Sequence, residues 1–164
     1  MRSTQESSAF PRIPDRYCSE NVWRQVSHSQ FPIAPSSAFP NGYSAKRPIV
    51  QVDLLAGTDR FSCFGIVDSG ADLCTFPLSF ALQLGLDPLT AKSSTSSGLG
   101  STNVPTYFWD IKIDRQGIIT FDVYAGFTEG LEAWGLGLLG QSGFFDRFPI
   151  IFDYKNDIFQ IYIP

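Results

Sequence analysis

The chain has 164 residues, of which 43% are hydrophobic. This fits one compact domain with some residues to spare, and a second catalytic domain does not fit. The net charge of −4 argues against a surface built to hold DNA or RNA, because such surfaces need clustered Lys and Arg. We therefore expect no nucleic-acid partner.

The cysteines and the apolar pattern set the expected compartment. Cys18, Cys63 and Cys74 are an odd number and lack the paired spacing of a zinc site, so neither a disulfide framework nor a metal centre is suggested. A reducing compartment is the simpler expectation. The first residues lead into no apolar signal segment, and no apolar run reaches the roughly 18 residues of a membrane span. We expect a cytoplasmic protein without a membrane partner.

Residues 1–47 differ in composition from the rest of the chain. They contain nine Ser and five Pro and show no sustained period of two or 3.6. They also hold six Lys or Arg against three Asp or Glu, whereas residues 48–164 are acidic. We interpret residues 1–47 as a tail or irregular arm. Their aromatic residues leave a docked arm and a free one equally open.

From residue 48 onward the pattern is rich in strands. The stretches 48–55 and 61–67 flank the turn signal Gly57-Thr58-Asp59 and predict a hairpin. β-rich runs predict four further strands, at 106–113, 118–124, 149–152 and 158–163. Two stretches are compatible with a helix, 78–84 and 141–148. These patterns predict an all-β domain with one or two short helices.

One of these strands leads directly into a candidate catalytic carboxylate. The apolar run 63–67 is followed by Asp68-Ser69-Gly70, which places an acid at the end of a buried strand, on a tight loop that Gly permits. The tripeptide is weak evidence alone, since average residue usage produces Asp-Ser/Thr-Gly in roughly one chain in fifteen of this length. An ordinary turn is the competing interpretation.

The surrounding features favour the catalytic interpretation. Asp68-Ser69-Gly70-Ala71-Asp72, a Ser/Gly-rich hairpin candidate at 93–101, and Leu138-Leu139-Gly140 follow one another in an order and spacing that resemble the retropepsins, the retroviral-type aspartic proteases. The resemblance covers about residues 48–163, and residues 1–47 match nothing in that family. It implies a closed acid-protease barrel, with a tail at 1–47 and the protease domain at 48–164.

The resemblance also implies roles for the loop residues. Asp68 matches the catalytic aspartate, and Ser69 matches the hydroxyl that interlocks two active-site loops across a dimer axis. Gly70 allows the loop to turn tightly, and Ala71 completes it.

Asp72 matches the second acid of the loop, which in the viral enzymes binds the substrate backbone and pairs with an arginine just after the later Gly. Here that arginine position is Gln141. Asp72 therefore lacks its usual partner unless Arg147 reaches it.

Two further segments match parts of a substrate-binding cleft. Residues 92–101, with the strand that follows them, resemble the flap, and Gly98, Leu99 and Gly100 would form its tip. A flexible surface loop is the alternative interpretation. Ile66, Leu138 and Leu139 would line the substrate pocket, although a plain core role for all three is equally compatible with the sequence.

The chemistry requires more than one such carboxylate. Hydrolysis of a peptide bond without a metal or a covalent nucleophile needs one carboxylate to take a proton from water while a second, protonated one donates to the amide oxygen. The chain has no second Asp-Ser/Thr-Gly. We therefore expect a twofold homodimer that joins two copies of Asp68 and hydrolyses a peptide or protein substrate, with no cofactor and no metal.

Other function classes are less well supported. Residues 135–140 form a literal GxGxxG, but no convincing strand precedes them and few residues remain for a dinucleotide-binding unit. His28 is the only histidine and lacks a Ser or Cys partner motif, so we interpret it as a surface or packing residue. The stronger rival is a catalytically silent module that keeps the barrel for dimerisation or peptide binding.

Overall fold

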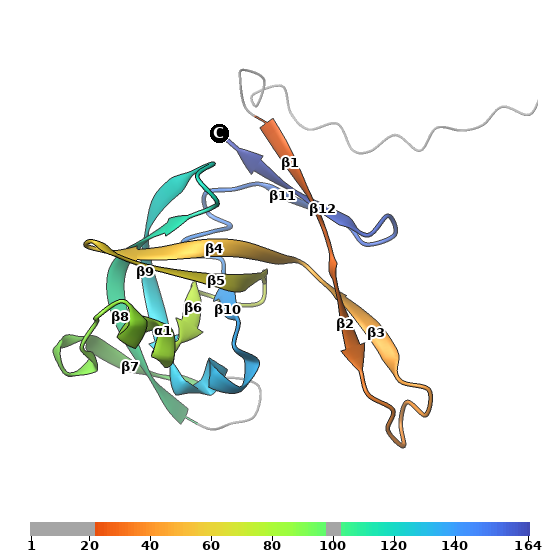
Figure 1. Cartoon of the computed structure of the whole chain (residues 1–164), viewed down its shortest axis with the longest axis horizontal. Helices are drawn as coiled ribbons and strands as arrows, with labels where there is room; N and C mark the ends of the chain where they lie inside the picture. The colour runs from red at the N-terminus through yellow and green to blue at the C-terminus, as the bar shows by residue number, and fades with distance from the viewer. Residues whose placement is uncertain (1–21, 98–102) are drawn as a thin grey trace, which may run out of the picture.

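The computed structural model describes residues 22–97 and 103–164 (Figure 1). The described part is mostly β-sheet, with the single α-helix α1 (Leu78–Gln83) and the short 3-10 helices η2 (Pro88–Thr90) and η3 (Glu129–Trp134). The predicted mostly β class is confirmed. No helix within these ranges is long and apolar enough to cross a membrane.

The largest sheet holds the candidate catalytic loop. Its strand order is β4-β5-β10-β6-β9-β8-β7. In that order the strands are β4 (Ile49–Ala56), β5 (Asp59–Val67), β10 (Gly137–Leu139), β6 (Thr75–Pro77), β9 (Thr120–Thr128), β8 (Asn103–Asp114) and β7 (Lys92–Ser97). β4 also pairs with β8, so the sheet turns back to its first strand. The predicted hairpin is present as β4 and β5.

The core is built by the alternate side chains of these strands. Inward positions on β4 and β9 repeat every second residue, as expected for a sheet with one buried face. Phe76 of β6 is fully buried and its ring centroid lies 5.7 Å from that of Phe127 on β9. β6 and β10 are only three residues long, too short to give a period in the sequence. Their pairing depends on contacts distant in the chain.

The predicted helix at 141–148 is wrong. This segment forms a series of turns, in which the N–H of Phe145 donates to the carbonyl of Gly140 (3.2 Å). Gly143 has a φ of +101°, which a right-handed helix cannot include. The carboxylate of Asp146 accepts the Gly143 N–H at 3.1 Å and holds this bend. Phe144 and Phe148 of this segment are nevertheless buried.

Residues 22–47 form strands that the sequence did not predict. β1 (Val22–Ser27) joins β12 (Ile158–Ile163) and β11 (Ile150–Asp153) in a sheet of order β1-β12-β11. β2 (Ser29–Ile33) and β3 (Tyr43–Arg47) form a separate hairpin that projects from the body (Figure 1). The pairing of β1 with β12 joins opposite ends of the chain, which no local pattern reveals. The division of the chain at residue 47 stays a prediction.

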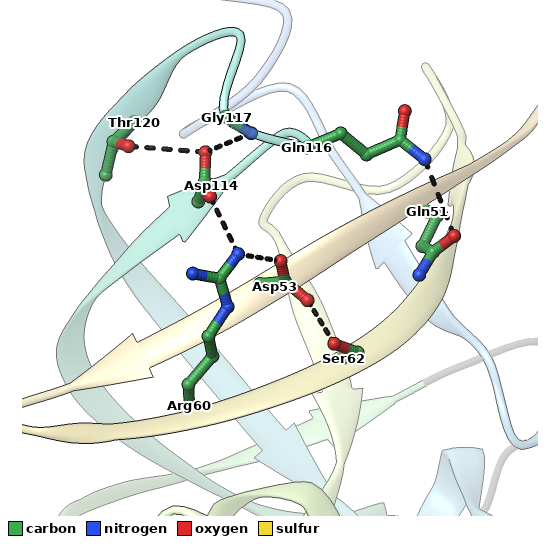
Figure 2. Close-up of polar contacts among 8 residues, drawn as sticks. All are labelled: Gln51, Asp53, Arg60, Ser62, Asp114, Gln116, Gly117 and Thr120. Carbon is green, nitrogen blue, oxygen red and sulfur yellow. Dashed lines mark hydrogen bonds and ion pairs between the residues drawn. The ribbon is translucent and has the colours of Figure 1, made fainter.

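A polar cluster lies where β4, β5 and β8 meet (Figure 2). The guanidinium of Arg60 bridges two buried carboxylates: it contacts Asp53 and lies 3.0 Å from Asp114. The Ser62 hydroxyl donates to Asp53. The N–H of Gly117 donates to Asp114 at 3.0 Å. These bonds compensate for removing both carboxylates from water.

This cluster makes stability depend on pH. The Ser62 hydroxyl, followed by Arg60, lowers the pKa of the Asp53 carboxyl. A lowered pKa contributes stability at pH values above the unfolded-state value of 3.8, and this stability is lost as the pH falls through the folded-state value.

We expect Asp53→Asn to reduce the free energy of unfolding at pH 6. Between pH 6 and pH 3 the variant should lose less of its free energy of unfolding than wild type does. Urea unfolding at both pH values measures this, with the exposed Asp110→Asn as control; equal pH dependence in wild type and Asp53→Asn would contradict it.

Candidate active-site loop

Asp68 follows directly from the buried end of β5. Its backbone N–H donates to the carbonyl of Leu139 at 3.1 Å, which continues the parallel pairing of β5 with β10. The Gly70 N–H donates to the Asp68 carboxylate at 2.9 Å, and the Ala71 N–H donates to the Asp68 carbonyl at 3.2 Å. The partly buried Asp68 side chain is therefore oriented by the backbone of its own loop.

Residues 141 and 142 form hydrogen bonds that support this loop. The backbone N–H of Gln141 donates to the carbonyl of Ala71 at 2.8 Å, and that of Ser142 donates to the carbonyl of Asp72 at 2.9 Å. The Gln141 side chain donates through Nε2 to the carbonyl of Ser69 at 2.8 Å. The backbone carbonyls of Ser69, Ala71 and Asp72 thus all accept hydrogen bonds from Gln141 or Ser142, which anchors the loop that follows Asp68.

Gly140 is required by the closeness of these two segments. A Cβ at this position would lie 2.4 Å from the carbonyl oxygen of Leu73 and 2.6 Å from that of Ala71. Both atoms belong to the backbone, so neither can rotate away. The sequence singled out Leu138-Leu139-Gly140 only through the resemblance. The bracing roles of Gly140 and Gln141 were missed, because no local signal shows which loop a distant residue will contact.

Asp72 has no ion-pair partner among the described residues. Its side chain is exposed, and the possible pairing with Arg147 is not found. The Arg147 guanidinium instead lies 5.9 Å from the centre of the Phe121 ring. Gln141 stands at the position of the expected arginine. It carries no charge for Asp72 and instead donates a hydrogen bond to the carbonyl of Ser69. In the same ranges, no three His, Cys, Asp or Glu side chains are grouped to hold a metal ion.

The residues predicted to line the pocket occupy different environments. Ile66 and Leu138 are neighbours on the parallel strands β5 and β10, and both are partly buried. Leu139 has no exposed surface and belongs to the core. It packs so closely on β5 that a Cβ added at Gly65 would lie 3.0 Å from the Leu139 side chain. Ile66 and Leu138 remain the better candidates for contact with a ligand.

The predicted flap coincides with the antiparallel pair β7 and β8. Their register runs from Lys92↔Phe108 to Ser97↔Asn103. The proposed tip residues Gly98, Leu99 and Gly100 lie outside the described residues. The flap role therefore stays a prediction.

The thiols of Cys63 and Cys74 are buried, and we expect them to be unreactive in the folded protein. Burial raises the pKa of Cys63 to about 12 and that of Cys74 to about 11. Because the thiolate is the reactive form, we expect neither residue to be alkylated in the folded protein at pH 8. Iodoacetamide labelling followed by peptide mapping measures this. Labelling in urea but not in buffer is the expected result, and rapid labelling of the folded protein would contradict the burial.

Comparison with known proteins supports the fold. No protein-family model matches the chain, and no curated protein matches it. Among solved structures, the chain is similar to the crystal structure of a retropepsin-like aspartic protease from Rickettsia conorii, with a TM-score of 0.52 and 16% sequence identity. The match covers 80% of this chain and 98% of that one. The described fold is therefore retropepsin-like, and at 16% identity the likeness shows the fold alone.

Proposed function

We propose that the chain is an aspartic endopeptidase that hydrolyses peptide bonds in the active site of a homodimer. The observation that carries this proposal is the braced loop that holds Asp68. A carboxylate at the end of a buried strand, oriented by the Gly70 N–H and supported by Gln141, is positioned to act on a bound molecule. The retropepsin-like fold adds independent support.

The reaction needs two copies of the loop. One Asp68 carboxylate takes a proton from a water molecule, and the resulting hydroxide attacks the carbonyl carbon of the peptide. Protonated Asp68 of the partner subunit donates to the carbonyl oxygen. When the C–N bond breaks, the Asp68 that took the proton from water gives it to the leaving nitrogen, and one hydroxyl of the tetrahedral intermediate returns its proton to Asp68 of the partner subunit. Two carboxylates about 3 Å apart cannot both ionise and share one proton, as is known for aspartic-protease dyads, so the pair supplies both acid and base.

The expected substrate is an extended peptide with apolar side chains near the cleaved bond. Ile66 and Leu138 offer aliphatic surface beside the loop. A β-hairpin such as β7–β8 can form backbone hydrogen bonds with an extended peptide. Such bonds depend little on the sequence of the peptide.

The alternative is a catalytically silent module that dimerises or binds peptide. It is favoured by the exposed Asp72, which has no ion-pair partner among residues 22–97 and 103–164, and by Gln141 at the position where the viral enzymes have an arginine. In such a protein Asp68 would contribute hydrogen bonds alone.

The experiment that tests the proposal is cleavage of a mixed peptide library by the full chain at several pH values between 3 and 8. Sedimentation in the same buffers shows whether the chain is a dimer. We expect cleavage beside apolar residues wherever the dimer is present. A stable dimer that cleaves nothing at any pH would favour the silent module.

A further inference from the structure

The β2–β3 hairpin leaves the body beside Asp68. β4 and β5 are antiparallel, so the start of β4 lies next to the end of β5. The carbonyl of Pro48, just before β4, accepts the Val67 N–H at 2.8 Å. The chain that precedes Pro48 therefore continues past the strand end from which Asp68 emerges. Figure 1 shows the hairpin projecting from this side of the body.

The root of the hairpin is fixed to the body. The Arg47 guanidinium lies 4.5 Å from the ring centre of Phe31 on β2 and 5.2 Å from that of Trp134 on η3. Lys46 lies 3.5 Å from the Asp157 carboxylate, which also accepts from Gln30 at 3.1 Å. These contacts set the direction of the hairpin.

The distal half of the hairpin has no cover in the described part of the chain. β2 and β3 form a two-stranded sheet of their own. The rings of Phe39 and Tyr43 lie 4.9 Å apart and are 51% and 49% exposed. A two-stranded hairpin is marginal in water without further packing, and its outer edges offer unpaired backbone groups. The exposed aromatic pair therefore suits a protein partner.

The charge of the hairpin permits contact with the body of another copy. The distal half of the hairpin, residues 33–43, holds no charged side chain, whereas residues 48–164 hold six basic and thirteen acidic residues. Lys46 and Arg47, the two basic residues of the hairpin, lie at its root and contact Asp157 and Trp134 of their own body. The distal half can therefore approach the acidic body of another copy without charge repulsion.

We propose that the β2–β3 hairpin docks on the body of a second copy of this chain through Phe39 and Tyr43. This inference rests on the proposed function, because the active site is incomplete without a second Asp68. A copy that brings its Asp68 toward the first must stand beyond the end of β5, where the hairpin extends. Each hairpin then grips the other subunit and helps to hold the two loops together.

The test compares dimerisation of wild type with that of the double variant Phe39→Ser, Tyr43→Ser by sedimentation over a range of concentrations. We expect the dissociation constant to rise about thirtyfold or more, as for the loss of central aromatic contacts in an interface. The matched control is Leu82→Ser, Leu89→Ser, which removes two exposed apolar side chains of α1 and η2 and should leave the dissociation constant unchanged. Thermal unfolding checks that both variants fold.

A photo-crosslinking residue at position 43 gives a second readout that does not depend on affinity. The experiment uses a mixture of chains with light and with heavy isotope labels. We expect crosslinks that join position 43 of a light chain to residues 48–164 of a heavy chain, and the reverse. An equally tight dimer of the hairpin variant, or crosslinks confined to one copy, would overturn the hairpin inference and leave the proposed protease intact. A tight, crosslinked dimer that cleaves no peptide would overturn the protease and leave the hairpin contact established.

Discussion

Asp68→Asn is expected to abolish peptide cleavage while leaving the fold and the dimer in place. Asparagine has nearly the same shape and keeps an oxygen that accepts the Gly70 N–H, but it cannot take a proton from water or donate an acidic one. General acid and base catalysis contributes about 10²–10⁴-fold to a rate, and here one residue serves both functions across the dimer, so we expect a loss of at least about 10³-fold in kcat. Initial rates on the best library peptide measure this.

The matched control for this variant is Asp72→Asn, which changes an exposed carboxylate four residues further along the same loop. Asp72 can contribute to peptide binding but has no place in the proton transfer, so its loss should act mainly on KM. Cleavage by Asp68→Asn at a rate close to that of wild type would remove Asp68 from the mechanism.

Gly140→Ala is expected to have the second largest effect, on both stability and activity. The added methyl group would lie 2.4 Å from the Leu73 carbonyl oxygen, so either the 69–73 loop or β10 must move. Overpacking of this kind costs about 1–3 kcal/mol, and more where backbone is displaced. A shift of the loop also moves Asp68, and a displacement of about 1 Å at a catalytic group can cost on the order of 10²-fold in rate.

Gly130→Ala provides the comparison for this substitution. A Cβ at Gly130 would meet its nearest atom, Oγ1 of Thr128, at an ordinary 3.6 Å. We expect its stability to stay within about 1 kcal/mol of wild type, because the smaller freedom of Ala in the unfolded chain offsets any small strain. If Gly140→Ala unfolds at the same urea concentration as Gly130→Ala and keeps full activity, the close contact between the two segments is not present in solution.

The sequence predicted those parts of the fold that carry a local pattern. The hairpin of β4 and β5, the strands β8, β9, β11 and β12, and the helix α1 all have apolar periodicity or turn residues within a few positions. The strands β1 to β3, β6 and β10 do not, because they are short or are stabilised by partners far away in the chain. The helix predicted at 141–148 rested on the stop signal at Pro149, whereas the bend at Gly143, which a right-handed helix cannot include, is held by Asp146.

The candidate site divides in the same way. Asp68 could be proposed as the catalytic residue from the sequence because its motif is contiguous and follows an apolar strand, and that role stays a prediction. The contact of Gly140 and Gln141 with the loop at 69–73 was not predicted. It joins positions about seventy residues apart, and neither Gly nor Gln indicates in the sequence which segment it will contact. Gln141 was noted only as a departure from the resemblance, whereas the structure gives it a hydrogen bond of its own.

The most direct test of the central claim mixes wild type with Asp68→Asn at constant total concentration and allows the subunits to exchange. If each active site needs Asp68 from both subunits, only wild-type pairs are active, and activity falls with the square of the wild-type fraction, to about a quarter at equal proportions. A linear fall, to about a half, would mean that each copy of Asp68 acts independently of the other and would contradict the shared active site.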